Sequence, residues 1–245
     1  MRAATAGGRA GDTGKIEEFL LRLSSSLSAG RGLHASGPEV ADSNLRRRLR
    51  SFVSNAGRLP ESVHGRLAVA LNQDQVPSKL WLIQHLAGSM PLPDSRILVV
   101  GGWFGVLPLL LRCIFPSWRI RTDLIDLDPA ACEVASTLLE GVVEDVTITC
   151  CNANEIDYVE FRREPRGIIV NTICEHMSDF ADWFGRIQPG QAIALQSNDH
   201  RGCSEHTNCV ASLEELEAQA PLAEKRFRGT LPLARFRRFM LIGRR

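Results

Sequence analysis

Apolar positions follow two different patterns, and the change comes at about residue 94. Before it, apolar residues recur at helical spacing over residues 15–27, 44–56, 61–71 and 79–87. After it, short continuous runs rich in valine and isoleucine alternate with amphipathic stretches, at residues 97–100, 124–126, 146–150, 167–170 and 191–197. Such runs are typical of parallel strands that are covered on both faces. The second pattern therefore predicts an α/β fold, with residues 225–230 and 235–242 as a closing antiparallel pair.

The same change in pattern predicts the organisation of the chain. Residues 1–14 contain four glycines and four alanines and little bulky apolar content, so we expect a disordered arm there. Residues 15–93 are expected to form an N-terminal helical cap or extension. Residues 94–245 are expected to form the sheet domain that carries the chemistry, in a seven-stranded, mostly parallel plan.

Charge and cysteine content narrow the classes of function. The 245 residues include 29 Lys and Arg against 28 Asp and Glu, so no net field favours nucleic acid or an anionic membrane. Arginines alternate with aromatics near the C-terminus, but a strand with core aromatics and exposed arginines explains this pattern better than RNA binding. Seven cysteines without a secretory signal indicate free thiols in a reducing, cytoplasmic compartment, and no apolar run is long enough to span a membrane. A homodimer is left open.

A glycine-rich turn follows the first buried run. Gly101, Gly102, Trp103 and Gly105 come directly after it, and Asp126 ends the next run, 21 residues after Gly105. Glycines let the backbone turn tightly beside a ligand, and a carboxylate at that distance can accept both hydroxyls of a ribose. The unit predicts a nucleoside half-site; an ordinary βαβ unit without a ligand is the alternative.

This stretch resembles the class I S-adenosylmethionine (SAM) dependent methyltransferase superfamily, and the resemblance extends over about residues 96–245. It implies a Rossmann-like fold and SAM as cosubstrate or sole substrate. The turn lacks the Asp/Glu-x-Gly that many members carry. The positions to which the resemblance assigns cofactor binding are Gly101, Gly102, Trp103, Gly105, Asp126, Leu127, Asn152, Ala153, Asn154 and Asn171.

Polar residues follow the fourth and fifth predicted strands, where open α/β sheets bind their ligands. Asn171, Glu175 and His176 follow the fourth strand, Ser197 ends the fifth, and Asp199 follows it. We take these five as the catalytic candidates, with Glu175 or His176 as the base that keeps an acceptor unprotonated.

Soft metal ligands also occur in this part of the chain, at Cys203, His206 and Cys209, with Cys174 and His176 as further candidates. A paired C-x2-C frame, which would make a zinc site a strong prediction, is absent. We therefore expect no metal.

The function predicted from these features is that of a SAM-dependent enzyme that transfers a methyl group to a small molecule. Residues 105–109 and 125–129 also resemble nicotianamine synthases, which transfer the aminobutyrate part of SAM. The alternative is therefore transfer or cyclisation of that side chain, as in azetidine-2-carboxylate-forming enzymes, with release of 5′-methylthioadenosine. A second alternative is a non-catalytic scaffold that binds a nucleoside.

Overall fold

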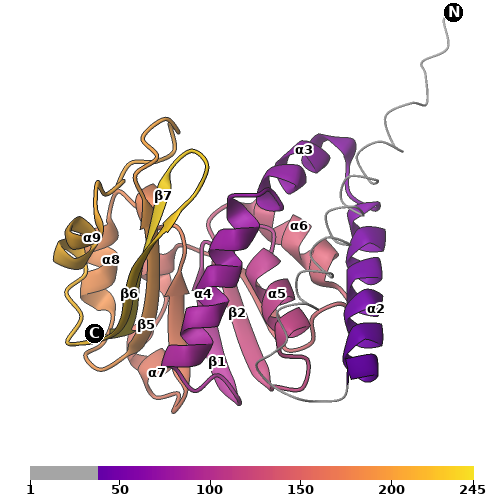
Figure 1. Ribbon diagram of the computed structural model, residues 1–245, viewed down its shortest axis with the longest axis horizontal. Coiled ribbons are helices and arrows are strands. Elements are labelled where there is room, and N and C mark those ends of the chain that lie inside the picture. The colour runs from indigo at the N-terminus through magenta and orange to yellow at the C-terminus, as the bar shows by residue number, and fades with distance from the viewer. Residues whose placement is uncertain (1–37) are drawn as a thin grey trace, which may run out of the picture.

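The computed structural model describes residues 38–245 of the chain (Figure 1). The predicted arm at 1–14 and the helical pattern at 15–27 lie outside the described residues. In chain order the elements are α2 (Pro38–Ala56), α3 (Glu61–Ala70), α4 (Gln75–Ser89), β1 (Ser95–Val100), α5 (Val106–Ile114), β2 (Ile120–Asp126), α6 (Pro129–Leu139), β3 (Val146–Cys150), η1 (Ala153–Glu155), α7 (Tyr158–Arg162), β4 (Gly167–Asn171), η2 (Cys174–His176), α8 (Phe180–Arg186), β5 (Ala192–Asn198), α9 (Leu213–Gln219), β6 (Glu224–Pro232) and β7 (Arg237–Arg244).

The described residues form one seven-stranded sheet with the order β3-β2-β1-β4-β5-β7-β6. Strands β1 to β5 are parallel, whereas β7 pairs antiparallel with both β5 and β6. This arrangement confirms the predicted Rossmann-like α/β fold, including the closing antiparallel pair. The strand order reverses between β1 and β4, which makes the crevice above these two strands the expected ligand position.

Two apolar layers cover the faces of the sheet. Alternate residues of each central strand point to opposite faces, so Ile97 and Val99 pack with α2 to α6, whereas Leu98 and Val100 pack against α7, α8 and α9. Figure 1 shows α4 running diagonally across the first face. The helices before β1 therefore bury their apolar sides on the same core as α5 and α6.

Helix α4 begins at Gln75, four residues before the predicted start. Asn72 accepts hydrogen bonds from the backbone N–H groups of Asp74 and Gln75, at 2.9 and 2.8 Å, and so caps this end. Pro77 lies in the first turn, where its missing N–H costs no helical hydrogen bond. At the far side, Gln196 of β5 accepts from the Ser78 hydroxyl (3.3 Å) and donates to its carbonyl (3.2 Å), which fixes α4 against the sheet.

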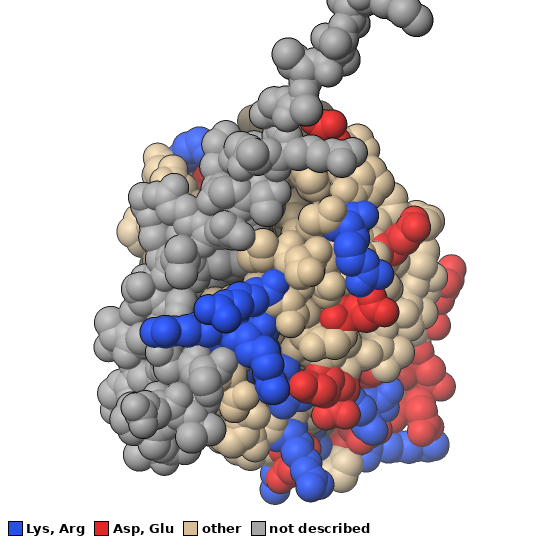
Figure 2. Space-filling model, turned by 90° about the vertical axis from the view of Figure 1, so that its right-hand side faces the viewer, with Lys and Arg blue, Asp and Glu red and all other residues tan. Residues whose placement is uncertain are grey.

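Charges of both signs are mixed on the face that carries α2 (Figure 2). Arg48 of α2 is nearly buried, since it donates to the Val142 carbonyl and pairs with Glu144 at 2.8 Å. Arg58 pairs with Glu140 at 2.6 Å on the surface. None of the helices in residues 38–245 is long and apolar enough to cross a membrane.

Candidate functional site

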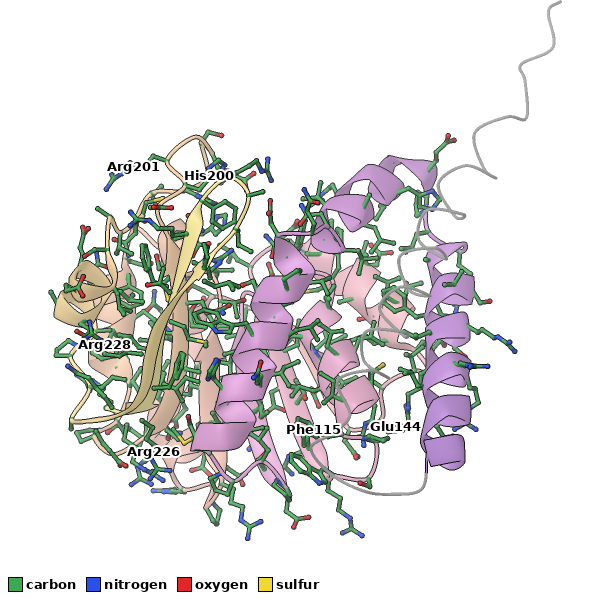
Figure 3. The ribbon with its side chains drawn as sticks, in the orientation of Figure 1. Phe115, Glu144, His200, Arg201, Arg226 and Arg228 are labelled. Carbon is green, nitrogen blue, oxygen red and sulfur yellow. The ribbon has the colours of Figure 1, made fainter. Side chains whose placement is uncertain are left out.

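The predicted site residues lie along the edge of the sheet where the parallel strands end. Val100 at the end of β1 is directly opposite Asn171 at the end of β4, so the loops that follow these two strands flank the point of strand reversal. Figure 3 shows His200 and Arg201, which follow β5, at one end of the molecule and Glu144, which precedes β3, at the other. The loops at the two ends of the sheet therefore carry different polar residues.

The turn after β1 needs its glycines for two reasons. Gly101 and Gly105 have positive φ angles of 66° and 73°, and Trp103 has a φ of 46°, which is uncommon for a residue with a side chain. A Cβ on Gly101 would also overlap the side chain of Ile173, which comes from the loop after β4. The two loops thus pack together without any space between them at this point.

Asp126 closes the turn from the side of β2. Its Oδ2 accepts a hydrogen bond from the backbone N–H of Trp103 (2.8 Å), and its Oδ1 accepts one from the N–H of Asp128 (3.0 Å). Each carboxylate oxygen has a second lone pair, so both can accept a further donor. The carboxylate therefore lies beside the turn, as the spacing from Gly105 predicts.

The remaining residues predicted to bind the cofactor line the same side of the edge. Leu127 leaves 70% of its surface exposed, which is unusual for a large apolar side chain. Asn152 accepts from the N–H of Asn154 (2.9 Å) and begins the short helix η1, and Asn154 donates to Asp179. Ala153 accepts from the Tyr158 hydroxyl at 2.8 Å. Both asparagines thus have local structural partners, as turn residues do.

Three of the five catalytic candidates are buried or already bonded to other residues of the chain. Asn171 is fully buried, accepts from the Ile173 N–H (2.9 Å) and donates to the Met177 sulfur (3.1 Å). Ser197 is also fully buried, and its hydroxyl has no partner among the described residues. Asp199 pairs with Arg237 at 2.7 Å, and the hydrogen bonds from this arginine lower the pKa of Asp199 although burial opposes the shift.

Glu175 is the centre of a buried charged group. It is 2% exposed, and its Oε1 accepts from the guanidinium of Arg238 (2.6 Å) and from the amide of Asn198. Arg238 is 3% exposed, so the expectation that the arginines of this strand face solvent is wrong for this residue. Its guanidinium turns inward because a buried carboxylate lies there to pair with it.

Lys79 of α4 belongs to the same group, although the sequence analysis did not single it out. Burial, together with the positive charge of Arg238, lowers the pKa of its ammonium from 10.5 to about 7, against the opposing effect of Glu175. The ammonium donates to the Gln75 side chain at 2.8 Å. A lysine in this state loses its proton near neutral pH and can then accept one from another group.

His176 lies beside His206 of the loop that follows β5, with ring centroids 4.5 Å apart in an edge-to-face arrangement. Burial is the main cause that lowers the pKa of His176, which favours the neutral ring. Glu175, His176 and His206 each offer one atom that could bind a metal ion, and these three atoms lie within 4.8 Å of one another. Among the candidate soft ligands, the sulfur of Cys209 lies 3.7 Å from Nδ1 of His206. The thiol of Cys174 donates to the Asn171 carbonyl.

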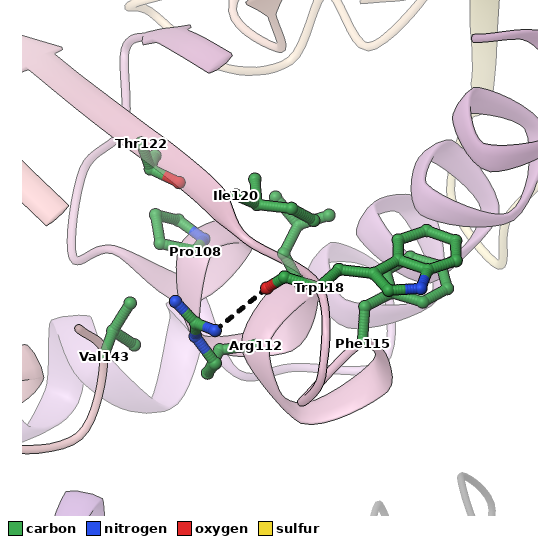
Figure 4. A pocket seen from close by; sticks show the side chains of 8 residues that line it. Pro108, Arg112, Phe115, Trp118, Ile120, Thr122 and Val143 are labelled. Carbon is green, nitrogen blue, oxygen red and sulfur yellow. Dashed lines mark hydrogen bonds between the residues drawn. The ribbon is translucent and has the colours of Figure 1, made fainter. Parts of the chain in front are cut away.

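Two hollows lie away from this edge. One is a narrow space between α5 and β2, lined by Pro108, Arg112 and Phe115 among others, where Arg112 donates to the Trp118 carbonyl (Figure 4). The other, of about 430 Å³, lies at the opposite end of the sheet, between the starts of β1, β2 and β4, and is lined by arginines and acids that pair with one another, such as Arg96 with Glu164. Neither contains a predicted site residue.

Comparison with solved structures shows which proteins share this architecture. The fold is that of class I SAM-dependent methyltransferases. No family model matches the chain, and no curated protein matches it. Among solved structures, the [4+2]-cyclase SpnF is similar with a TM-score of 0.54 and 13% identity over 70% of this chain and 82% of its own.

Two further solved structures are similar. Geranyl diphosphate C-methyltransferase from Streptomyces coelicolor A3(2), solved with Mg²⁺, geranyl diphosphate and S-adenosyl-L-homocysteine, has a TM-score of 0.53 and 13% identity over 76% of this chain and 87% of its own. MtNAS, solved in complex with MTA and tNA, has a TM-score of 0.48 and 14% identity over 94% of this chain and 75% of its own. At identities this low, structural similarity shows the fold alone. The match to MtNAS, with its TM-score of 0.48, adds nothing to that assignment.

The structure also adds residues that the sequence analysis missed. Lys79, Asn198 and Arg238 join Glu175. His206, which the sequence named only as a candidate soft metal ligand, lies beside His176. A signal existed for Asn198, because it ends a buried strand at the ligand-binding edge. No local pattern marks Lys79 or Arg238, since only the packing of α4 and β7 on the sheet brings them to Glu175.

Proposed function

We propose that this chain is a SAM-dependent enzyme that transfers the methyl group of SAM to a small-molecule acceptor. The observation that carries the proposal is the position of Asp126, whose carboxylate lies within hydrogen-bond distance of the glycine turn at the point of strand reversal. In this geometry Asp126 accepts the ribose hydroxyls, while the turn passes beneath the nucleoside. The fold shared with SAM-dependent enzymes supports the same reading.

The exposed face of Leu127 supports the placement of the adenine. A flat base that covers this side chain removes apolar surface from water, which favours binding. Asn152 and Asn154 follow β3 on the same side and offer amide groups to the edge of the base. We therefore assign the β1–β2–β3 part of the edge to SAM.

The acceptor belongs on the other side, beside β4 and β5. His176, with its lowered pKa, and Lys79, with a pKa of about 7, are both able to take a proton near neutral pH. Asn171 holds the loop that carries His176 rather than touching the acceptor, since both ends of its amide are bonded within the chain. Methyl transfer then requires the acceptor in line with the methyl group and a neutral base beside it.

The test is to incubate the full chain with SAM, with and without pools of amines, phenols and carboxylic acids, and to identify the nucleoside products by mass spectrometry. Acceptor-dependent formation of S-adenosylhomocysteine supports methyl transfer. Formation of 5′-methylthioadenosine from SAM alone above the rate without enzyme instead supports the side-chain reaction and overturns methyl transfer. Failure to bind SAM in a calorimetric titration overturns the proposal as a whole.

A further inference from the structure

The imidazoles of His176 and His206 converge on the buried carboxylate of Glu175, outside the proposed nucleoside half-site. Donor atoms of Glu175, His176 and His206 lie within 4.8 Å of one another. Asn208 holds the two segments together, because its N–H donates to the Glu175 carbonyl (2.8 Å) and its amide to the Cys174 carbonyl (3.2 Å). The convergence is therefore built into the backbone and does not depend on the side chains alone.

The tautomer of His206 is fixed by a hydrogen bond. Its Nδ1 lies 2.7 Å from the backbone carbonyl oxygen of His200. Since a carbonyl only accepts, Nδ1 carries the proton and Nε2 keeps its lone pair. Metal-binding histidines are oriented in this manner, with one ring N–H donated to a carbonyl or carboxylate and the other nitrogen left for the ion.

Glu175 has one oxygen to spare. Arg238 and Asn198 both donate to Oε1, whereas Oε2 is buried and has no partner among the described residues. A buried carboxylate oxygen without a donor is costly, and an ion removes that cost. This orphaned oxygen is a second observation, independent of the two imidazoles, that indicates a ligand at this place.

The charges around the cluster and the types of ligand atom in it indicate which ion fits. Arg238 and Lys79 reduce the negative field of Glu175, while Glu205, on the same loop as His206, adds a negative charge near His176. A hard cation such as Mg²⁺ or Ca²⁺ needs several oxygens and has one here. Two imidazoles and one carboxylate suit Zn²⁺, Co²⁺, Ni²⁺ or Fe²⁺.

We propose that Glu175, His176 and His206 bind one divalent first-row transition-metal ion. Three protein ligands leave a position for water or substrate, as in catalytic zinc sites and in the two-histidine, one-carboxylate iron sites. Binding draws the donor atoms together to about 3.3 Å, the spacing that tetrahedral bonds of about 2 Å impose. This inference departs from the expectation of no metal and does not rest on the proposed function. With the ion bound, His176 is a ligand, which leaves Lys79 as the base.

The test is a titration of the metal-free, full-length protein with Co²⁺ in the absence of SAM, followed by competition with Zn²⁺. The variants are His176→Gln and His206→Gln, and the control is His85→Gln, a residue of α4 whose ring stacks on Phe227 of β6 and which is not a member of the cluster. We expect one Co²⁺ per chain for the parent and the control, with affinity at least tenfold lower in each variant. Far-UV circular dichroism verifies that all four proteins are folded.

Two outcomes overturn the proposal. Equal affinity of the parent and the two histidine variants places any bound ion elsewhere in the chain. A thiolate-to-cobalt charge-transfer band identifies cysteine ligands, such as Cys203 and Cys209, in place of Glu175. Because the readout needs no SAM, a negative result here leaves the methyltransferase proposal standing, and a failure to bind SAM leaves the metal proposal standing.

Discussion

The backbone N–H of Trp103 donates a 2.8 Å hydrogen bond to Oδ2 of Asp126, and this bond joins the turn after β1 to the end of β2. The carboxylate thereby supports a strained turn, in which Trp103 has a φ of 46°, and keeps lone pairs for a ligand. One side chain thus contributes both to the shape of the proposed nucleoside site and to its chemistry.

Replacement of Asp126 by Ala is expected to weaken SAM binding at least tenfold, since the ribose hydroxyls lose a charged acceptor. Isothermal titration calorimetry measures the effect. Asp128→Ala is the matched control, because this residue caps α6 through the Ala130 N–H and pairs with Arg66, so its loss weakens the helix without removing the ribose acceptor. If both variants bind SAM like the parent, Asp126 has been assigned the wrong role.

Gly101→Ala is expected to lower the free energy of unfolding by about 2–4 kcal/mol, through a positive φ and overlap with Ile173. Gly141→Ala separates the two causes. Gly141 has a similar φ of 64° but open space around it, so we expect a loss of only about 1 kcal/mol from backbone strain. Urea unfolding gives both values, and equal losses would show that the contact with Ile173 contributes nothing.

Glu175→Ala is expected to destabilise the chain by about 3–5 kcal/mol, because it leaves the guanidinium of Arg238 buried without its carboxylate. The comparison is Asp199→Ala, which breaks the pair with Arg237, a side chain that is 54% exposed; we expect about 1 kcal/mol or less. Urea unfolding at pH 7.5 measures both. A small loss for Glu175→Ala would mean that water reaches this pair.

Lys79 is expected to make stability depend on pH. Folded, it loses its proton near pH 7, whereas unfolded it keeps the proton to about pH 10.4. Between these values the unfolded state binds the extra proton, so stability rises with pH. The free energy of unfolding of the parent should therefore rise relative to Lys79→Met from pH 7 to pH 9. A difference that stays constant over this range contradicts the shifted pKa.

Much of the fold was predictable because its signals are local. The continuous apolar runs located β1 to β5, and the bounds of β3 agree with the predicted ones. The spacing in sequence between Gly105 and Asp126 predicted that Asp126 lies beside the glycine turn, because a short helix and a strand return the chain to the same edge. The short elements α7, η1 and η2 were missed, since a single turn is too brief to show a period.

The charged group around Glu175 was less predictable because its members are far apart in the sequence. Lys79 precedes Glu175 by about a hundred residues and Arg238 follows it by 63. The arginines of β7 look alike in sequence, yet Arg237 is half exposed and Arg238 is buried, as strand alternation requires. Which of the two faces the core depends on the register between β5 and β7, which pairs Asn198 with Arg238.

The exposure of Leu127 has a thermodynamic consequence. With 70% of its surface in water, this side chain contributes to the hydration heat capacity of the unliganded protein. A ligand that covers it removes that contribution, so the enthalpy of association becomes more negative as temperature rises. Shortening the side chain in Leu127→Ala reduces this slope, and it does so even if the affinity at any single temperature hardly changes.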